Sequence, residues 1–168
     1  MVNGEKIFRI GLGYDIHPFS EGRKLFLGGI EIPYQKGLKG HSDGDVLIHA
    51  IMDALLGAIG LPDIGFFFPN NETYKDIESI LLLKEVLKMV EERGFKIENI
   101  DVVIIAEEPK ILPYREKIIS NLAFHLSIYK ENINIKATSN EGIGFIGKKE
   151  GIAVLAVALL SKEKKYAG

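Results

Sequence analysis

The chain has 168 residues, of which 46% are hydrophobic and 26% charged, a size and composition typical of one globular domain. Its formal net charge of -2 provides no strong field for nucleic acid or an anionic membrane, so we expect neither as a partner. The absence of cysteine excludes disulfides, thiolate nucleophiles and cysteine-based metal sites, which leaves His, Asp and Glu as the strong metal ligands.

The composition of the terminal segments predicts the extent of the domain and the cellular location. We expect a single domain over residues 1–168, with a frayed basic tail after about residue 161. The opening residues, MVNGEKIFRI, lack the apolar core of a signal peptide, and the longest apolar run is broken by His49 and Asp53. The sequence therefore favours a cytoplasmic protein.

The first half of the chain predicts two strands followed by two helices. Residues 6–17 and 24–33 are short β-rich runs separated by glycine, and they could pair as a hairpin. A nearly all-apolar helix follows, capped by Asp43 or Asp45 and ending near residue 60, before a proline. Residues 78–94 repeat apolar positions at the helical period and stop at a glycine.

The second half predicts a strand at residues 99–107, a helix at 113–128 with proline in its first turn, and an alternating strand at 132–138. The final apolar run, residues 150–165, fits either a central strand or a buried helix. A mobile loop is expected at residues 67–76. With the last run as a strand, this order indicates an α+β fold in which helices cover one face of a mixed sheet.

Two polar half-sites suggest a metal centre. Asp15 and His17 lie two apart at a strand end, so they share one face, although a surface strand end would also look like this. His49 lies on the buried helix with Asp45 and Asp53 one turn away on either side, which also fits a satisfied core histidine. Together they supply three N/O ligands with a fourth position open, as in catalytic zinc sites. Asp53 or Asp45 could then accept the other ring N–H of His49.

Two loops carry weaker signals. The GIGFIG run at residues 142–147 matches a dinucleotide-binding fingerprint, but only 21 residues follow it, too few for that fold. It is either a turn or, with the hydroxyls of Thr138 and Ser139, a phosphate-binding loop. Lys110 lies between two prolines in a stiff loop that could read a base edge or simply connect two elements.

Four segments together resemble a known family: GYDIHPF, GLKGHSDGDVLIHAIMDALLGAIGLPDIGFFFP, IIAEEPKILP and KATSNEGIGFIGKKEGIAVLAVALL. From about Arg9 to Leu160, the chain is similar to the 2-C-methyl-D-erythritol 2,4-cyclodiphosphate synthases of non-mevalonate isoprenoid biosynthesis. The resemblance implies a cyclising phosphorus–oxygen lyase. Its substrate is 4-diphosphocytidyl-2-C-methyl-D-erythritol 2-phosphate, whose 2-phosphate attacks the β-phosphate to form 2-C-methyl-D-erythritol 2,4-cyclodiphosphate and release CMP.

The resemblance also implies a ferredoxin-like two-layer sandwich in which the last segment is a strand, and a homotrimer with active sites between subunits. Zinc would be held by Asp15, His17 and His49, and magnesium or manganese by Glu141. Two other readings stay open. One is a zinc-dependent phosphodiesterase or nucleotide hydrolase with metal-bound water as the attacker. The other is a non-enzymatic trimeric scaffold or binding module whose zinc is structural.

The resemblance assigns catalytic hydrogen-bond donation to His41 and Ser139. It places a larger set in contact with the diphosphocytidyl substrate: Asp15, Ile16, His17, His41, Ser42, Asp63, Ile64, Gly65, Phe68, Pro69, Asn70, Asn71, Glu72, Ala106, Pro109, Lys110, Ile111, Leu112, Thr138, Ser139, Asn140, Glu141, Phe145 and Lys148. Three of them depart from the family's pattern. Asn70 replaces an acid and loses a charge, and Ser139 replaces a common Thr but keeps the hydroxyl. Lys148 replaces a common Arg and loses its planar fork, which weakens the expectation that an isoprenoid diphosphate binds in the trimer's central cavity.

Overall fold

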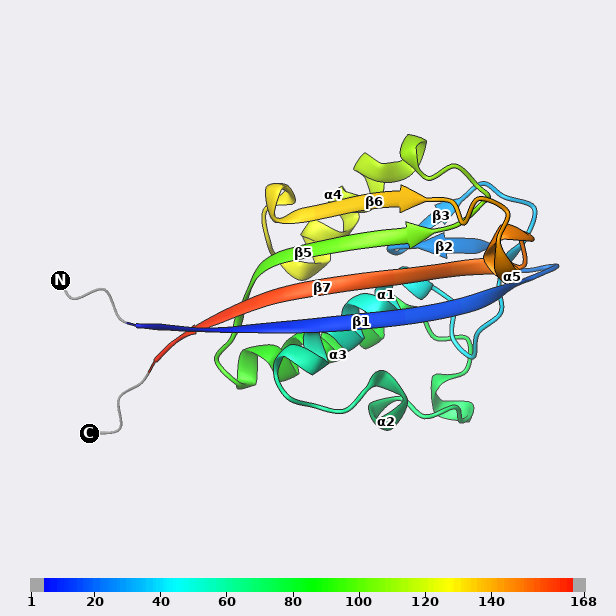
Figure 1. Ribbon diagram of the computed structural model, residues 1–168. Helices are drawn as coiled ribbons and strands as arrows, with labels where there is room; N and C mark the ends of the chain where they lie inside the picture. The colour runs from blue at the N-terminus through cyan, green and yellow to red at the C-terminus, as the bar shows by residue number, and fades with distance from the viewer. Residues whose placement is uncertain (1–4, 165–168) are drawn as a thin grey trace.

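A computed structural model describes residues 5–164 (Figure 1). Its elements, in chain order, are β1 (Lys6–Ser20), β2 (Leu25–Leu27), β3 (Ile30–Ile32), β4 (Gly37–Leu38), α1 (Val46–Ala58), α2 (Ile64–Phe67), η1 (Glu72–Tyr74), α3 (Ser79–Glu92), β5 (Lys96–Ile105), η2 (Leu112–Tyr114), α4 (Arg115–Leu126), η3 (Lys130–Asn132), β6 (Ile133–Thr138), α5 (Gly144–Gly147) and β7 (Gly151–Glu163). The segment expected to be a mobile loop thus contains the end of α2 and all of η1.

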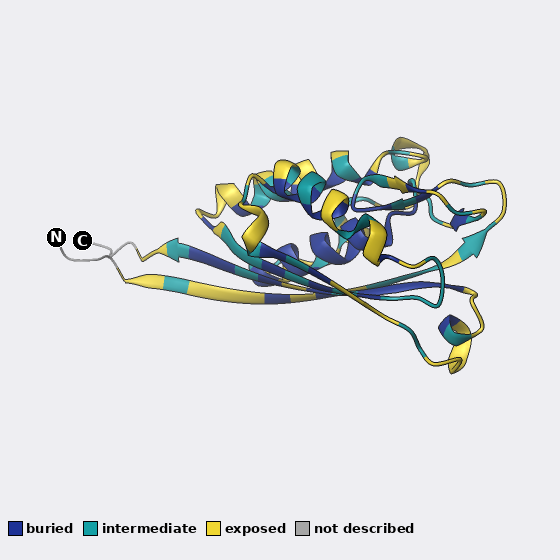
Figure 2. Cartoon of the chain, turned by 90° about the horizontal axis from the view of Figure 1, so that it is seen from above, coloured by how far each residue is buried: buried dark blue, intermediate teal, exposed yellow. Residues whose placement is uncertain are grey.

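The main sheet has five strands in the order β4-β1-β7-β5-β6. β5 and β6 run parallel, whereas β1 pairs antiparallel with both β4 and β7, and β7 antiparallel with β5. Figure 2 shows the long helices on one side of this sheet and exposed residues along the other. The α+β, ferredoxin-like arrangement of a mixed sheet with helices on one face is therefore confirmed.

The expected pairing of the first two β-rich runs is wrong. Residues 25–32 form a hairpin of their own, β2–β3, with Gly28 and Gly29 at positive φ in its turn. β1 instead pairs along its length with the final segment, from Lys6 with Glu163 to Pro18 with Gly151. The final segment is a strand because its burial on both faces suits a position between β1 and β5.

β7 also occupies part of the predicted tail. It continues to Glu163, so residues just after 161 are paired in the sheet, while 165–168 lie outside the described residues. The helix expected from residue 113 likewise divides into η2, which contains the proline, and α4, which begins at Arg115.

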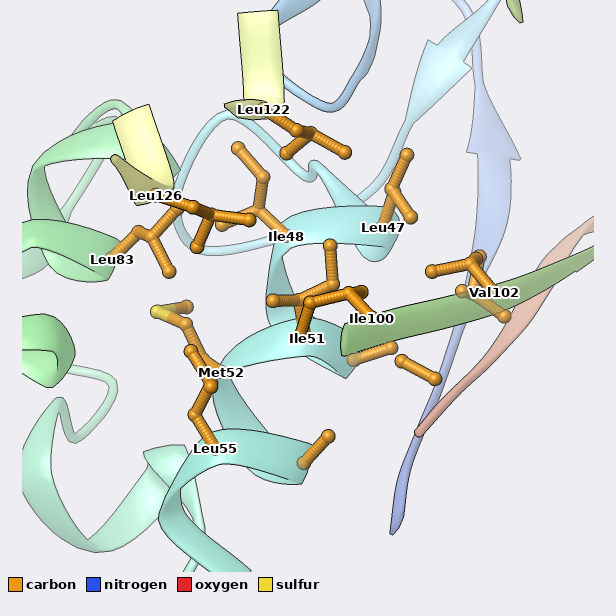
Figure 3. Packing of buried hydrophobic residues seen from close by; sticks show 14 of the residues in the cluster. Leu47, Ile48, Ile51, Met52, Leu55, Leu83, Ile100, Val102, Leu122 and Leu126 are labelled. Atoms are coloured by element: carbon orange, nitrogen blue, oxygen red, sulfur yellow. The ribbon is translucent and has the colours of Figure 1, made fainter. Parts of the chain in front are cut away.

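Helix α1 is the centre of the core. Figure 3 shows its apolar side chains packed against Leu83 of α3, Val102 of β5 and Leu122 of α4. α1 also lies directly on β1, because a Cβ at Gly11 would come within 1.8 Å of Ala54 O. This close approach brings the end of β1 against the first turns of α1, where the metal half-sites lie.

Candidate active site

Three side chains from two elements meet where β1 lies against α1. Asp15 and His17 come from β1 and His49 from α1. Asp15 Oδ2 lies 2.8 Å from His17 Nε2 and 3.0 Å from His49 Nδ1, and the two ring nitrogens are 3.2 Å apart. The expected convergence of the two half-sites is confirmed, and we call these three residues the triad.

The triad has the chemistry and spacing of a divalent metal site. Four ligands placed about 2.1 Å from a tetrahedral zinc ion lie about 3.4 Å from one another, close to the distances between the triad atoms. One carboxylate oxygen and two imidazole nitrogens supply three ligands, and these atoms lie within 4.8 Å of one another. The Asp15 side chain keeps 24% of its surface exposed and His17 17%, so one side of the triad is open. The arrangement fits a metal with a free coordination position.

The triad residues also perturb one another's protonation. Burial opposes ionisation of Asp15, but hydrogen bonds from His17 and His49 outweigh it and hold the pKa of the carboxyl well below its ordinary value. Burial also opposes protonation of His17, yet its hydrogen bond to Asp15 raises the pKa of the imidazole above its ordinary value. Asp15 is therefore ionised, as a metal ligand must be.

The ring nitrogens that face away from the triad have partners of their own. His17 Nδ1 donates to the backbone carbonyl of Lys39 at 2.5 Å, so the neutral imidazole can present a lone pair on Nε2 to a metal in place of its contact with Asp15. His49 Nε2 lies 3.0 Å from Ser79 Oγ and 3.2 Å from Ser42 Oγ. Both histidines are thus oriented by hydrogen bonds from outside the triad.

The expectation that Asp45 or Asp53 orients His49 is therefore wrong. The Asp45 carboxylate caps α1 by accepting the Ile48 N–H at 3.1 Å, and it also accepts two N–H groups from the β2–β3 turn. Asp53 accepts the Ile64 N–H at 2.8 Å and so holds the start of α2. Each carboxylate accepts backbone N–H groups that would otherwise be unpaired near the core, which would cost free energy of folding.

A cavity of about 290 Å³ opens beside the triad. The expected site residues in its walls are Asp15, His17, His41, Ser42, His49, Ile64, Gly65, Phe68 and Asn70. His41 Nε2 donates to the carbonyl of Asn71 at 2.5 Å, which ties the His41 loop to the segment after α2. Most residues expected between positions 15 and 72 therefore lie around one cavity.

Sequence reasoning missed several residues of this cavity. Gly40, Tyr74 and Leu82 also line it. Tyr74 lies within the segment predicted as a mobile loop, so its position there was a usable signal, whereas nothing local marks Leu82 on α3. Arg23, also missed, donates to the backbone carbonyl of Ser42 at 2.5 Å and supports the loop that carries His41.

The remaining expected residues of the first half lie beside the cavity. The Ile16 N–H donates to Asp15 Oδ1 at 2.8 Å, and Asp63 caps α2 by accepting the Gly65 N–H at 2.9 Å. Pro69, Asn71 and Glu72 lie between α2 and η1 or at the start of η1.

A second group lies at the ends of β5 and β6. It consists of Ala106, Pro109, Lys110, Ile111, Leu112, Thr138, Ser139, Asn140, Glu141, Phe145 and Lys148. Ser139 Oγ donates to Glu141 Oε1 at 2.5 Å. Glu107, which sequence reasoning missed, accepts the Asn140 N–H at 2.8 Å and the Gly142 N–H at 3.3 Å.

The segment that carries Ser139 and Glu141 is not brought to the triad within one chain. β7 and β5 lie between β1 and β6, so three strand spacings, about 14 Å, separate the triad strand from the β6 end where this segment begins. In addition, Ser139, Asn140 and Glu141 are half-buried or exposed and line no part of the triad cavity. The chain therefore presents two separate halves of the expected site.

Comparisons with known proteins identify the family of this chain. The profile of the YgbB family matches residues 8–161. A 2-C-methyl-D-erythritol 2,4-cyclodiphosphate synthase from Carboxydothermus hydrogenoformans is 57% identical over 152 residues, covering 90% of this chain and 93% of the relative. A second synthase, from Caldicellulosiruptor bescii, is 53% identical over 155 residues and covers 92% and 99% of the two chains.

Solved structures show the same fold. IspF from Plasmodium falciparum, solved as a CDP complex, superposes with a TM-score of 0.82 at 37% identity and covers 94% of this chain and 97% of its own. The bifunctional IspDF from Campylobacter jejuni gives a TM-score of 0.90 at 43% identity, although this chain matches only 43% of that longer one. By sequence and fold, the chain belongs to the YgbB family, in which its curated relatives are 2-C-methyl-D-erythritol 2,4-cyclodiphosphate synthases.

Proposed function

We propose that this protein cyclises 4-diphosphocytidyl-2-C-methyl-D-erythritol 2-phosphate to 2-C-methyl-D-erythritol 2,4-cyclodiphosphate and releases CMP, in non-mevalonate isoprenoid biosynthesis. The observation that carries the proposal is the triad of Asp15, His17 and His49, open to a cavity that His41 also lines. The relatives named above support a synthase, not the hydrolase or scaffold alternatives.

The triad is the zinc site in this proposal, and Glu141 provides the ligand for magnesium or manganese. When bound, these ions neutralise charge on the phosphate oxygens as Lewis acids. The residues themselves support this role, because Asp15 is held ionised and each histidine has one ring nitrogen facing the other triad residues while its second ring nitrogen is bound outside the triad. Glu141 lies in the second group, apart from the triad, and accepts a hydrogen bond from Ser139 Oγ.

The nucleophile of this reaction is already an anion, so no general base has to activate it. Catalysis then depends on holding two negatively charged phosphates in line and on donating hydrogen bonds to the charge that grows. His41 is placed to donate because it lines the triad cavity, and Ser139 because it lies beside Glu141 at the end of β6. Without substrate their protons are donated to Asn71 O and to Glu141, so the substrate has to take the place of these acceptors. Each such donor contributes about 2.7–4 kcal/mol to transition-state stabilisation.

The cytidine end of the substrate belongs to the second group. The Lys110 loop follows β5, and its neighbour Ala106 is joined to β6 by an N–H bond to Thr138 O at 2.9 Å. A loop anchored in this way presents fixed backbone groups to a base. The Plasmodium falciparum relative was solved as a CDP complex, which supports a cytidine nucleotide as part of the substrate.

We place the complete active site between subunits of a homotrimer. Two observations support this: the two halves are far apart within one chain, and the helix-free face of the sheet is apolar. Alternate β1 residues on that face are exposed: Phe8, Ile10, Leu12 and Tyr14. Ile10 is 71% exposed and Leu12 65%, and neighbouring exposed apolar side chains of this kind mark interaction surfaces. A closed ring of three copies buries this face and joins each triad to a neighbour's Glu141 loop.

The trimer is tested by Ile10→Lys, which places a charge in the proposed interface. We expect a smaller species by light scattering, with zinc content retained and activity lost, because the triad is built within one chain. Leu81→Lys is the matched control, since Leu81 is an exposed apolar residue on α3, away from this face. A trimer that survives Ile10→Lys with full activity contradicts the arrangement.

The cellular setting is also a proposal. No helix within residues 5–164 is long and apolar enough to cross a lipid bilayer. The proposed substrate is a small charged nucleotide, and we place the reaction in the cytoplasm, with neither nucleic acid nor membrane as a partner.

The function is tested by following products with phosphorus NMR. Purified protein is incubated with the diphosphocytidyl substrate and magnesium, before and after zinc is stripped, and again after zinc is restored. We expect CMP and a cyclic diphosphate that disappear on stripping and return with zinc. Linear phosphates would indicate the hydrolase instead, and no turnover by the zinc-loaded protein would indicate the scaffold.

A further inference from the structure

We propose that Ser79, oriented by the carboxylate of Asp43, is a positioning residue that sets the orientation of His49 and thereby the metal affinity of the triad. The inference rests on the proposed function only in taking the triad as a metal site. It assigns a role to two residues that lie outside the ligand set and outside the expected substrate contacts.

The geometry forms a chain of hydrogen bonds leading away from the triad. His49 Nε2 lies 3.0 Å from Ser79 Oγ, and Ser79 Oγ donates to Asp43 Oδ1. The second oxygen of Asp43 accepts the Ser79 backbone N–H at 2.9 Å. Both hydrogen-bond donors of Ser79, its backbone N–H and its hydroxyl, therefore bind one carboxylate.

These bonds fit the tautomer of His49 that a metal requires. Without metal, Nδ1 can donate to Asp15; to bind a metal, Nδ1 must be unprotonated, so the ring proton then resides on Nε2. Because the only hydroxyl proton of Ser79 points to Asp43, Ser79 Oγ presents lone pairs to His49 and accepts the Nε2 proton. The carboxylate thus acts on the histidine through the serine, where many metal sites use a direct carboxylate–histidine contact.

Burial makes this arrangement specific. Ser79 is fully buried and His49 is 7% exposed, so water has little access to replace a lost partner. Ser42 Oγ also lies near His49 Nε2, at 3.2 Å, but no carboxylate accepts its hydroxyl proton among the described contacts. The Ser42 hydroxyl can therefore donate to His49 Nε2 or accept from it, whereas the Ser79 hydroxyl can only accept from His49 because its proton is donated to Asp43.

A purely structural role for the same residues makes a different prediction. Glu78, at the N-cap of α3, provides no side-chain cap, and Asp43 supplies one from a distant segment through the Ser79 N–H. Backbone bonds from Asp43 N to Ile77 O and from Asp76 N to His41 O join the same two segments. Ser79→Ala removes only the hydroxyl and keeps the backbone N–H that Asp43 caps, so it separates the two roles.

The test measures zinc affinity by competition with a chromophoric chelator at fixed pH, using zinc alone. For Ser79→Ala we expect weakening by about 10–100-fold, the range for losing an outer partner of a ligating histidine. The absorption spectrum of the cobalt-substituted protein should change as well, because the ligand geometry relaxes. Ser79→Thr, which keeps the hydroxyl, should restore most of the affinity.

Ser161→Ala is the matched control, because Ser161 is also buried and also donates to a carboxylate, that of Glu98, far from the triad. We expect no change in its zinc affinity. Should Ser79→Ala fail to fold, Asp43→Asn keeps the shape and removes the charge, and a loss of several-fold is then expected.

Zinc affinity of a folded Ser79→Ala or Asp43→Asn protein within about twofold of wild type overturns the proposal. The proposal is also overturned if Ser161→Ala loses as much zinc affinity as Ser79→Ala. The affinity is measured without substrate, so this result is independent of whether the wild-type protein forms the cyclic product.

Discussion

The two halves of the site are built differently. The triad half lies over the core: Gly11 and Gly13 of β1 contact the α1 backbone, and His49 is buried among hydrogen-bond partners. The Glu141 half lies at the exposed ends of β5 and β6, where Glu107 accepts two of its backbone N–H groups. The candidate metal-binding half forms within a single chain, whereas in the proposed trimer the other half acts only when it meets a neighbour's triad.

The largest effect is expected at the triad. His49→Ala removes one of three ligands, so we expect zinc to be lost and the rate to fall by more than the roughly 10³-fold upper range for one hydrogen-bond donor. Zinc content by atomic absorption and turnover by phosphorus NMR measure both. If the variant kept its zinc and its activity, the triad would not be the metal site.

The next effect is expected in the other half. Ser139→Ala removes a donor to the transition state, so kcat should fall by about 10²–10³-fold while zinc content and melting temperature stay unchanged. A fall in kcat with unchanged zinc content would show that the two halves act separately, because zinc binding at the triad does not involve Ser139. Loss of zinc from Ser139→Ala would show instead that the halves depend on each other.

Mixing the two inactive variants sharpens the comparison further. If each site joins the triad of one subunit to the Glu141 loop of the next, exchange of His49→Ala and Ser139→Ala subunits restores intact sites. Random mixing at equal amounts should recover about one quarter of wild-type activity. Failure to recover activity, with subunit exchange verified by mass spectrometry, would place each site within one chain.

The close contact under the triad half is tested by stability. A Cβ at Gly13 would lie 1.9 Å from Ala50 O, so Gly13→Ala must push α1 away from β1. We expect a loss of about 1–3 kcal/mol in the free energy of unfolding, measured with denaturant on the metal-free protein. Gly57→Ala is the control, because its Cβ would meet nothing closer than 3.9 Å and alanine favours a helix. Equal destabilisation by Gly57→Ala would mean that the contact between Gly13 and Ala50 is not the cause.

The smallest effect is expected at Glu107, which holds the loop but touches no reacting group in the proposed site. Glu107→Ala should lower kcat by no more than about tenfold, since a partly exposed hydrogen bond contributes about 1 kcal/mol. The magnesium concentration for half-maximal activity should rise, with zinc binding unchanged. Glu108→Ala is the control, because Glu108 binds Lys149 and Tyr34 instead of this loop. An equal effect of both variants would mean that the loop is not held by Glu107.

Much of the fold could be predicted because its signals are local. The strand period places Asp15 and His17 on one face, the apolar run marks α1 as buried, and Asp45 caps it as expected. The two metal half-sites follow from these local rules alone. Most of the finer site assignments came from resemblance to a family, which carries information that spacing does not.

Other features depended on contacts distant in sequence. The long pairing of β1 with β7 joins the two ends of the chain, and no local pattern distinguishes it from a β1–β2 hairpin. The partner of His49 was misassigned for the same reason: helical spacing pointed to Asp45 and Asp53, but the backbone uses both carboxylates. Ser79, 30 residues away, becomes a neighbour only when α3 packs on α1.

By itself the sequence determined the types of residue available for chemistry, the class of fold and the three candidate metal ligands, because periodicity and residue type act over a few positions. Only the tertiary structure decided that Ser79 and Asp43 support His49, that Glu107 holds the Glu141 loop, and that the two halves lie about three strands apart. Hydrogen bonds of this kind are chosen by which polar groups become buried together, and that is settled when the elements pack.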